Sequence, residues 1–272
     1  MNAPCSIWSQ FYNTREPEEA IYEFRKAGVT HIELSHEHSA ALLERCEDHI
    51  AEGKRFSAFL KEVGISAPQG HLDFPTRFVR DEDYLPGLVR EIEMFEAIGI
   101  KNAVLHIDPI DADNTDYRER IERNIVKLRE LCELVGHVDI SLCLENLCTT
   151  LIRVEDLIEI IERVGSDKLA ICLDTGHLNI MKGNTQGDFI RKAGKYLKAL
   201  HVHDNDGSCD QHLIPFARGT VDFKDIITAL RDIDYQGLFN FEIPGDSHRC
   251  PTEVKGAKIA YLRAVYDYIM SL

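Results

Sequence analysis

Apolar residues along the chain follow two patterns, one with a period of two and one with a period close to 3.6. Short runs of the first kind predict strands, and longer runs of the second kind predict helices. The predicted strands cover residues 4–9, 29–35, 65–72, 102–108, 139–146, 169–175, 197–204 and 237–243. The predicted helices cover residues 16–27, 39–63, 83–98, 114–136, 153–164, 187–195, 222–234 and 251–270.

Eight strand–helix units in alternation predict a parallel sheet with right-handed crossovers. Eight such units close a barrel. The alternative is a doubly wound open sheet, but the first strand–helix turn has no glycine-rich phosphate loop. We therefore predict an α/β fold of the (β/α)8 TIM barrel type, as a single domain over residues 1–272, with its active site at the carboxyl ends of the strands.

Four of the predicted strands alternate large apolar residues with small or polar ones. The large positions are Leu142/Leu144, Ile171/Leu173, Leu200/Val202 and Phe239/Phe241. The other positions are Ser141/Cys143/Glu145, Ala170/Cys172/Asp174, Ala199/His201/His203 and Leu238/Asn240/Glu242. A narrow barrel needs small residues inside and large ones against the helices. Glu145, Asp174, His201 and Glu242 are therefore expected to share the inward face at the strand ends.

Three carboxylates and one imidazole in this arrangement indicate a divalent-metal site, and they suit Mn²⁺, Mg²⁺, Co²⁺ or Zn²⁺ equally. The alternative is a set of ion pairs or capping residues at the end of the barrel. Four such groups in register would leave the carboxylates repelling one another without a cation, so we predict that a metal binds there.

Further histidines occupy similar places, namely His71, His106, His177, His203 and His212. His212 forms an Asp-x-His pair with Asp210. Each histidine taken singly is interpreted as an ordinary hydrogen-bonded side chain. As a group at one rim, they indicate contacts with substrate hydroxyls or a second metal.

The composition argues against nucleic acid and membrane partners. The 46 acidic residues outnumber the 31 basic ones, giving a formal net charge of -15, and the basic residues are scattered singly along the helices. Such a field repels polyanions. No run approaches the roughly 20 apolar residues of a membrane helix. The eight cysteines form no CxxC pair, which is typical of a reducing compartment, so we predict a cytoplasmic protein.

The whole chain resembles the xylose isomerase-like barrel superfamily, in particular its sugar phosphate isomerase/epimerase group, which shares its fold with endonuclease IV. The most specific segment runs from His201-Val-His-Asp-Asn-Asp-Gly through Asp210-x-His212 to Gly219-Thr-Val-Asp222-Phe. The resemblance implies a single-metal site formed by Glu145, Asp174, His201 and Glu242. The motif can also be registered so that His203 takes the place of His201 as the histidine ligand.

This resemblance implies a metal-dependent isomerase or epimerase acting on a ketose sugar, a sugar phosphate or an inosose. Its chemistry would pass through a metal-stabilised ene-diolate, with Glu145 and Glu242 as the acid/base pair. Loss of a β-hydroxyl from the same ene-diolate would make the protein a dehydratase or lyase, which is the alternative. The predicted substrate contacts are His71, His106, His177, His203, His212 and Arg218. Arg218 either holds a phosphate or carboxylate group or is a surface arginine.

Two other functions are alternatives. An endonuclease IV-like trinuclear zinc phosphodiesterase would use His71, His106, Glu145, Asp174, His177, His201, Asp210, His212 and Glu242. The net charge opposes it, and Phe216-Ala217-Arg218-Gly219 departs from the nuclease's Gly-Glu-Gly. A non-catalytic sugar-binding barrel would have no need for two metal-bridging glutamates. The predicted partner is a small sugar or cyclitol, and because relatives are often dimers or tetramers, a homo-oligomer is an open alternative.

Overall fold

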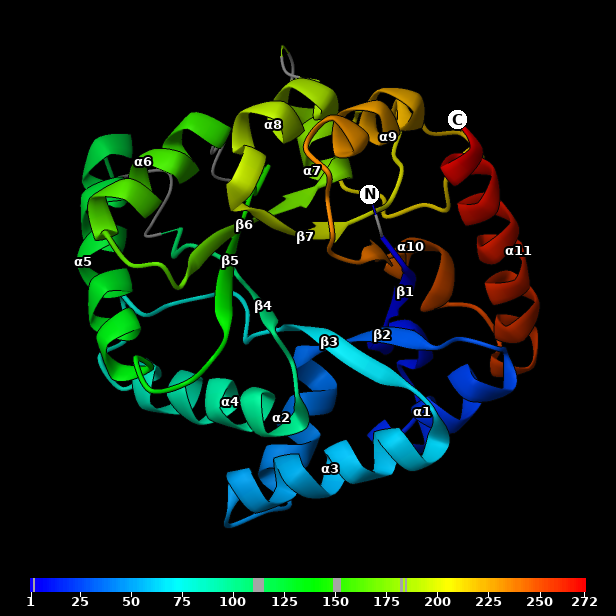
Figure 1. Ribbon diagram of the computed structural model, residues 1–272, viewed down its shortest axis with the longest axis horizontal. Helices are drawn as coiled ribbons and strands as arrows, with labels where there is room; N and C mark the ends of the chain where they lie inside the picture. The colour runs from blue at the N-terminus through cyan, green and yellow to red at the C-terminus, as the bar shows by residue number, and fades with distance from the viewer. Residues whose placement is uncertain (2, 110–114, 149–152, 182, 184) are drawn as a thin grey trace.

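The computed structural model describes residues 1, 3–109, 115–148, 153–181, 183 and 185–272, and its strands form a ring surrounded by helices (Figure 1). The strands are β1 (Cys5–Trp8), β2 (His31–Leu34), β3 (Ser66–His71), β4 (Asn102–Leu105), β5 (Ser141–Glu145), β6 (Leu169–Asp174), β7 (Leu197–His201) and β8 (Phe239–Phe241). They pair in parallel in the order β7-β6-β5-β4-β3-β2-β1-β8. Hydrogen bonds from Val202 N to Asn240 O (2.8 Å) and from Glu242 N to Val202 O (3.2 Å) join β7 to β8. The predicted TIM barrel is confirmed.

The helices largely follow the predicted ranges. They are α1 (Pro17–Lys26), α2 (His36–Glu44), α3 (His49–Val63), α4 (Tyr84–Ile98), α5 (Tyr117–Leu134), α6 (Val154–Val164), α7 (Thr175–Ile180), α8 (Gln186–Ala193), α9 (Phe223–Asp232), α10 (Pro244–Ser247) and α11 (Thr252–Ser271). Short 3-10 helices cover Ser9–Tyr12 and Gly194–Tyr196. Within the described part of the chain, no helix has the length and apolar character needed to cross a bilayer.

One helix prediction needs correction, one remains open, and two short helices were missed. The single helix predicted over 39–63 is wrong, because the structure divides this region into α2 and α3. Asp48 starts α3: its Oδ1 accepts hydrogen bonds from the backbone N–H groups of Ile50 and Ala51, both at 3.0 Å. An Asp that satisfies two free N–H groups favours a new helix start over a continuous helix. The predicted start of the helix at 114 lies outside the described residues. The short helices α7 and α10 were not predicted.

The inside of the barrel confirms the alternation seen in the sequence. Small side chains from neighbouring strands form their own buried cluster, made of Val104, Cys143, Ala170, Cys172 and Ala199. The large side chains of the other parity belong to the main core, which includes Leu142, Leu144, Ile171, Leu173, Leu200, Val202, Phe239 and Phe241. The inward face of the barrel therefore carries small residues along the strands and polar side chains at the strand ends.

A buried carboxylate on α4 fixes part of the rim around the strand ends. Glu91 Oε1 accepts a hydrogen bond from the Ser39 hydroxyl and lies 3.0 Å from His36 Nδ1, while Oε2 accepts one from Asp73 N at 3.1 Å. His36 Nε2 is 3.1 Å from Asp73 Oδ1. Burial opposes the imidazolium charge, but the hydrogen bond and charge of Glu91, with the charge of Asp73, outweigh it and raise the pKa of His36. This imidazolium joins α2, α4 and the segment after β3.

The His36 contacts predict a pH-dependent contribution to stability. Because the pKa of His36 in the folded state lies above its ordinary 6.5, the contribution is fully present below pH 6.5 and is lost as the pH rises through the folded-state value. We expect His36→Gln to lower the free energy of unfolding by about 1–3 kcal/mol at pH 5.5 and by less at pH 9. Urea unfolding of both proteins at the two pH values measures this difference.

His137→Gln is the matched control for this prediction. His137 also pairs with a glutamate, Glu93, at 2.9 Å, but its side chain is 58% exposed. Solvent-exposed pairs contribute roughly 0–1 kcal/mol, so the control is expected to change stability little at either pH. A His36→Gln effect that is larger at pH 9 than at pH 5.5 would contradict the assignment.

Candidate metal centre and active site

Four consecutive strands around the ring bring the four predicted metal ligands together. Glu145 ends β5, Asp174 ends β6, His201 ends β7 and Glu242 follows β8. One ligand atom from each of these side chains lies within 4.8 Å of the ligand atoms of the other three. His201 Nδ1 is 3.3 Å from Glu145 Oε1 and 3.2 Å from Glu242 Oε2. We call these four residues the metal cluster.

The chemistry of the metal cluster fits a divalent cation. Glu145, Asp174 and His201 are buried, and the side chain of Glu242 is 12% exposed. The buried Nδ1 of His201 faces two carboxylates, yet it has no hydrogen-bond partner among the described residues. Carboxylates gathered away from water are costly unless a cation neutralises them. Three oxygen donors with one imidazole nitrogen suit Mn²⁺, Mg²⁺, Co²⁺ or Zn²⁺.

Three further histidines surround the carboxylate of Glu145. Its Oε2 is 3.0 Å from His106 Nε2 and 3.6 Å from His71 Nε2, and its Oε1 is 3.3 Å from His177 Nδ1. Burial disfavours the charged carboxylate, but the charges of His201 and His106 and the hydrogen bonds from His106 and His177 outweigh burial. They hold the pKa of Glu145 well below its usual range. Glu145 is therefore ionised at neutral pH, as a metal ligand or a base must be.

A second group of metal-ligating side chains lies beside the metal cluster. Asp210 Oδ2 is 3.1 Å from His177 Nε2 and 2.9 Å from His212 Nε2. The ligand atoms of His177, Asp210 and His212 lie within 4.8 Å of one another. Burial opposes protonation of His212, but its hydrogen bond to Asp210 and the charge of Glu242 raise its pKa to about 9. His212 therefore carries a proton at neutral pH, and its two ring N–H groups are directed to Asp210 Oδ2 and, at 3.1 Å, to Glu242 O.

The geometry favours His201 over His203 as the histidine of the metal cluster. His203 Nε2 is 2.9 Å and 3.0 Å from the two carboxylate oxygens of Asp174, and its ring stacks on His212 with centroids 3.8 Å apart. Its ligand nitrogen groups with a carboxylate oxygen of Asp174 and a ring nitrogen of His212, whereas the ligand nitrogen of His201 groups with carboxylate oxygens of Glu145, Asp174 and Glu242. His203 therefore holds the outer side of Asp174.

Arg218 lies on an exposed loop between β7 and α9. Buried Asp204 organises this loop, because its carboxylate accepts hydrogen bonds from Phe216 N (3.2 Å) and Val221 N (3.0 Å). A Cβ at position 219 would lie 1.9 Å from Asp204 Oδ1, so the loop can approach Asp204 only with Gly219 there. The loop follows β7 at the same rim, and a contact between Arg218 and substrate stays a prediction.

Two polar residues not singled out from the sequence hold the strand ends in place. Asn146 Nδ2 donates to Asp174 O at 3.0 Å, and its Oδ1 accepts from Asp174 N at 2.8 Å. Thr175 Oγ1 donates to His203 O at 2.8 Å. Asn146 directly follows Glu145, and Thr175 directly follows Asp174. This adjacency is the signal that could have pointed to them.

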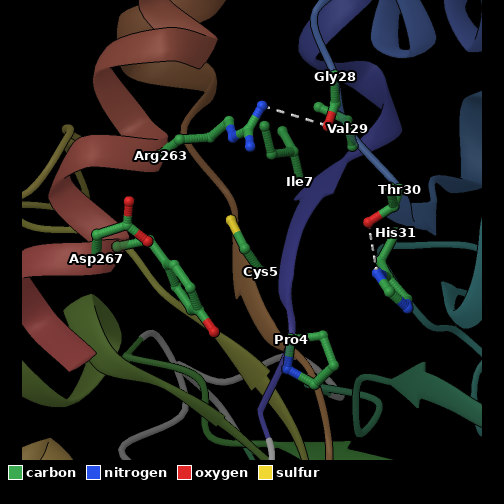
Figure 2. A pocket seen from close by; sticks show the side chains of 10 residues that line it. Pro4, Cys5, Ile7, Gly28, Val29, Thr30, His31, Arg263 and Asp267 are labelled. Carbon is green, nitrogen blue, oxygen red and sulfur yellow. Dashed lines mark hydrogen bonds between the residues drawn. The ribbon is translucent and has the colours of Figure 1, made fainter.

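A cavity of about 230 Å³ lies at the opposite, amino-terminal end of the barrel, beside the starts of β1 and β2 and against α11 (Figure 2). Burial, only partly opposed by the charge of Arg263, raises the pKa of the Cys5 thiol to about 12. The thiol is therefore neutral at pH 7 and a poor nucleophile. The possible metal-binding groups of the described residues all lie at the other end of the strands, so the carboxyl-terminal rim is the candidate active site.

Comparisons with known proteins agree with this architecture. A D-psicose 3-epimerase from Enterocloster bolteae is 36% identical over 132 residues, which are 47% of this chain and 40% of that protein. A probable endonuclease 4 from Mycoplasmopsis agalactiae is 23% identical over 202 residues, 68% of this chain and 70% of that protein. The crystal structure of a D-psicose 3-epimerase from Clostridium cellulolyticum H10, with D-tagatose, superposes with a TM-score of 0.81 at 17% identity, covering 98% of this chain and 99% of that one.

Several of these matches cover only part of the relative's length. The chain spans 53%, 44% and 40% of the length of three curated relatives that it matches. At 17% identity, the structural likeness establishes the fold and leaves the reaction open. Residues 21–265 match the family described as Xylose isomerase-like TIM barrel, which is most of the chain. The protein belongs to the xylose isomerase-like TIM barrel family.

Proposed function

We propose that this protein is a divalent-metal-dependent epimerase or isomerase that acts on a ketose sugar, a sugar phosphate or an inosose. The observation that carries the proposal is the metal cluster, Glu145, Asp174, His201 and Glu242, at the rim where barrel enzymes bind their substrates. The names of the similar D-psicose 3-epimerases support a sugar substrate.

The two glutamates are the proposed acid/base pair. A divalent ion bound by the cluster would act as a Lewis acid on the substrate carbonyl and make the neighbouring C–H more acidic. Glu145 ends β5 and is buried, whereas Glu242 follows β8 and is partly exposed, so the two carboxylates approach the rim from different strands. One carboxylate would remove the proton, and the other would return a proton to the opposite face. Return of the proton to the neighbouring carbon would give isomerisation instead.

The remaining rim side chains are proposed to orient the substrate. His212 and His177 share Asp210 and are proposed substrate contacts at this part of the rim. His71 and His106 would contact the substrate from the side of β3 and β4. His203, whose ring stacks on that of His212, is a further proposed contact. A cytoplasmic location and a homo-oligomeric state stay predictions.

Proton exchange with solvent tests the proposed function. Metal-loaded protein is incubated with D-psicose or D-fructose in D₂O, and deuterium at carbon 3 is followed by NMR. We expect deuterium incorporation together with interconversion of the two sugars, loss of both after chelation, and recovery with Mn²⁺ or Co²⁺. Metal-containing protein that exchanges no proton of any ketose, ketose phosphate or inosose would contradict the proposal.

A second candidate, a trinuclear zinc phosphodiesterase, is favoured by one observation. Besides the metal cluster, His71, Glu145 and His201 form a group within 4.8 Å, as do His177, Asp210 and His212. The predicted nuclease ligands therefore fall into adjoining groups around Glu145. The net charge of -15 opposes binding of a duplex. Cleavage of an abasic-site duplex by the zinc-loaded protein, without sugar exchange, would favour this candidate.

A further inference from the structure

The carboxylate of Glu33 lies inside the barrel, below the metal cluster, and takes no part in the proposed reaction. Glu33 lies on β2, is buried, and points inward between two register partners, Trp8 on β1 and Gln69 on β3. Its Oε1 is 2.9 Å from His201 Nε2. The two residues are 168 positions apart in the chain, and β1 and β8 stand between their strands in the ring (Figure 1). Glu33 therefore reaches across the barrel interior to one ligand of the metal cluster.

The surroundings of Glu33 fix it as a hydrogen-bond acceptor. Gln69 Nε2 donates to its Oε1 at 3.2 Å, and Asn240 Nδ2 donates to its Oε2. Both amides thus turn their N–H groups toward Glu33, and their amide oxygens have no hydrogen-bond partner among the described residues. With His201, these side chains place three nitrogen atoms around one buried carboxylate, which offers only oxygen acceptors to them.

The contact with Glu33 determines which nitrogen of His201 can bind a metal. A histidine that binds a metal gives up the second proton of its ring and is left with one N–H and one lone pair. With the N–H at Nε2 directed to Glu33, the lone pair lies at Nδ1. That is the unpartnered atom 3.3 Å from Glu145 Oε1 and 3.2 Å from Glu242 Oε2. The ring is also held from one side by His71, which stacks on it with centroids 5.5 Å apart.

We infer that Glu33 is a positioning residue of the metal centre: it holds His201 with its Nδ1 lone pair toward the metal cluster and increases the basicity of that nitrogen. A carboxylate that accepts the second N–H of a ligating histidine has this effect on other metal sites. The inference rests on the proposed function, because it assumes that the metal cluster binds a cation.

Titration of metal-stripped protein with Co²⁺, followed by visible absorption, tests the inference. Glu33→Gln keeps the size of the side chain and an acceptor for His201 Nε2 but removes the negative charge. We expect its Co²⁺ affinity to fall about 10–100-fold and its absorption bands to shift, because the ligand field of His201 changes.

Glu91→Gln is the matched control. Glu91 is an equally buried glutamate that also pairs with a histidine, His36, but it lies on α4 outside the metal cluster. We expect its Co²⁺ affinity to stay within about 3-fold of the wild-type value, with the same absorption bands. A purely structural role of buried glutamates would lower the stability of both variants without shifting the bands of either.

The outcomes separate the inference from the proposed function. Wild-type protein that binds Co²⁺, with a Glu33→Gln variant that matches it in affinity and spectrum, overturns the inference and leaves the proposed function standing. Wild-type protein that binds no Co²⁺ overturns both. Should Glu33→Gln fail to fold, long-range ¹H–¹⁵N NMR of zinc-loaded wild-type protein decides. A proton on His201 Nε2 supports the inference, and a proton on Nδ1 overturns it.

Discussion

Replacing Glu242 by glutamine is expected to slow the interconversion of the two sugar epimers by about 10²–10⁴-fold, the usual contribution of a positioned acid/base group. The amide keeps the size of the side chain and one oxygen toward the metal cluster, but it cannot take up a proton. Glu145→Gln is expected to slow interconversion to a similar extent. Each variant is assayed with the metal content measured in the same sample, because both residues are also proposed ligands.

Exchange of the substrate's carbon-bound proton with solvent distinguishes a mechanism with two bases from a mechanism with one. If Glu145 and Glu242 serve opposite faces, each variant should still exchange the proton of one epimer with solvent and lose exchange for the other. Glu93→Gln is the control: this glutamate lies on α4 and pairs with His49 and His137 away from the rim. Loss of exchange for both epimers in one variant, with both exchanges kept in the other, would show that one carboxylate does all the proton transfer.

Replacing Gly176 by alanine is expected to destabilise the protein by about 1–3 kcal/mol and to weaken metal binding. A Cβ at this position would lie 2.0 Å from His203 Cε1 and 2.5 Å from His203 Nδ1. Because the ring is buried and stacks on His212, it cannot move aside without breaking its contact with Asp174. Urea unfolding and metal titration of the variant measure the two effects.

Gly256→Ala is the control with the opposite expected sign. Gly256 lies inside α11, and apart from its two chain neighbours and the nearby backbone of α11 itself, no heavy atom comes within 4 Å of a Cβ built there. A glycine in the middle of a helix costs roughly 0.5–1 kcal/mol relative to alanine, so this variant should be more stable than the wild type. A Gly176→Ala variant as stable as Gly256→Ala would show that His203 has more room than the structure gives it.

The sequence predicted the strands and the metal cluster because both depend on the same physical constraint. The inside of a narrow barrel admits only small side chains, so the alternation in β5 to β8 identified the inward positions. The four inward residues at the ends of these strands then had to meet at one rim. The period of the apolar pattern and the face to which each strand residue points were sufficient to predict these positions, because both are local properties of the chain.

The features that were predicted wrongly or missed depend on contacts between side chains, which the periodicity of apolar residues does not reveal. Residues 44–49 contain no glycine or proline that would mark the end of a helix, and the hydrogen bonds of Asp48 decide that a new helix starts there. His201 and His203 share one parity, so the choice between them depended on where β7 ends relative to its neighbours. The role of Glu33 depends on a contact with His201, which lies 168 positions away in the chain and comes from the far side of the barrel.

The most direct test of the single-metal site is the number of metal ions per chain. The protein is purified without chelators, and its metals are measured by elemental mass spectrometry alongside an Asp174→Ala variant. We expect about one Mn, Mg, Co or Zn ion per wild-type chain and a large loss in the variant, because Asp174 belongs to the metal cluster. About three zinc ions per chain, or no metal after reconstitution, would contradict a single-metal epimerase.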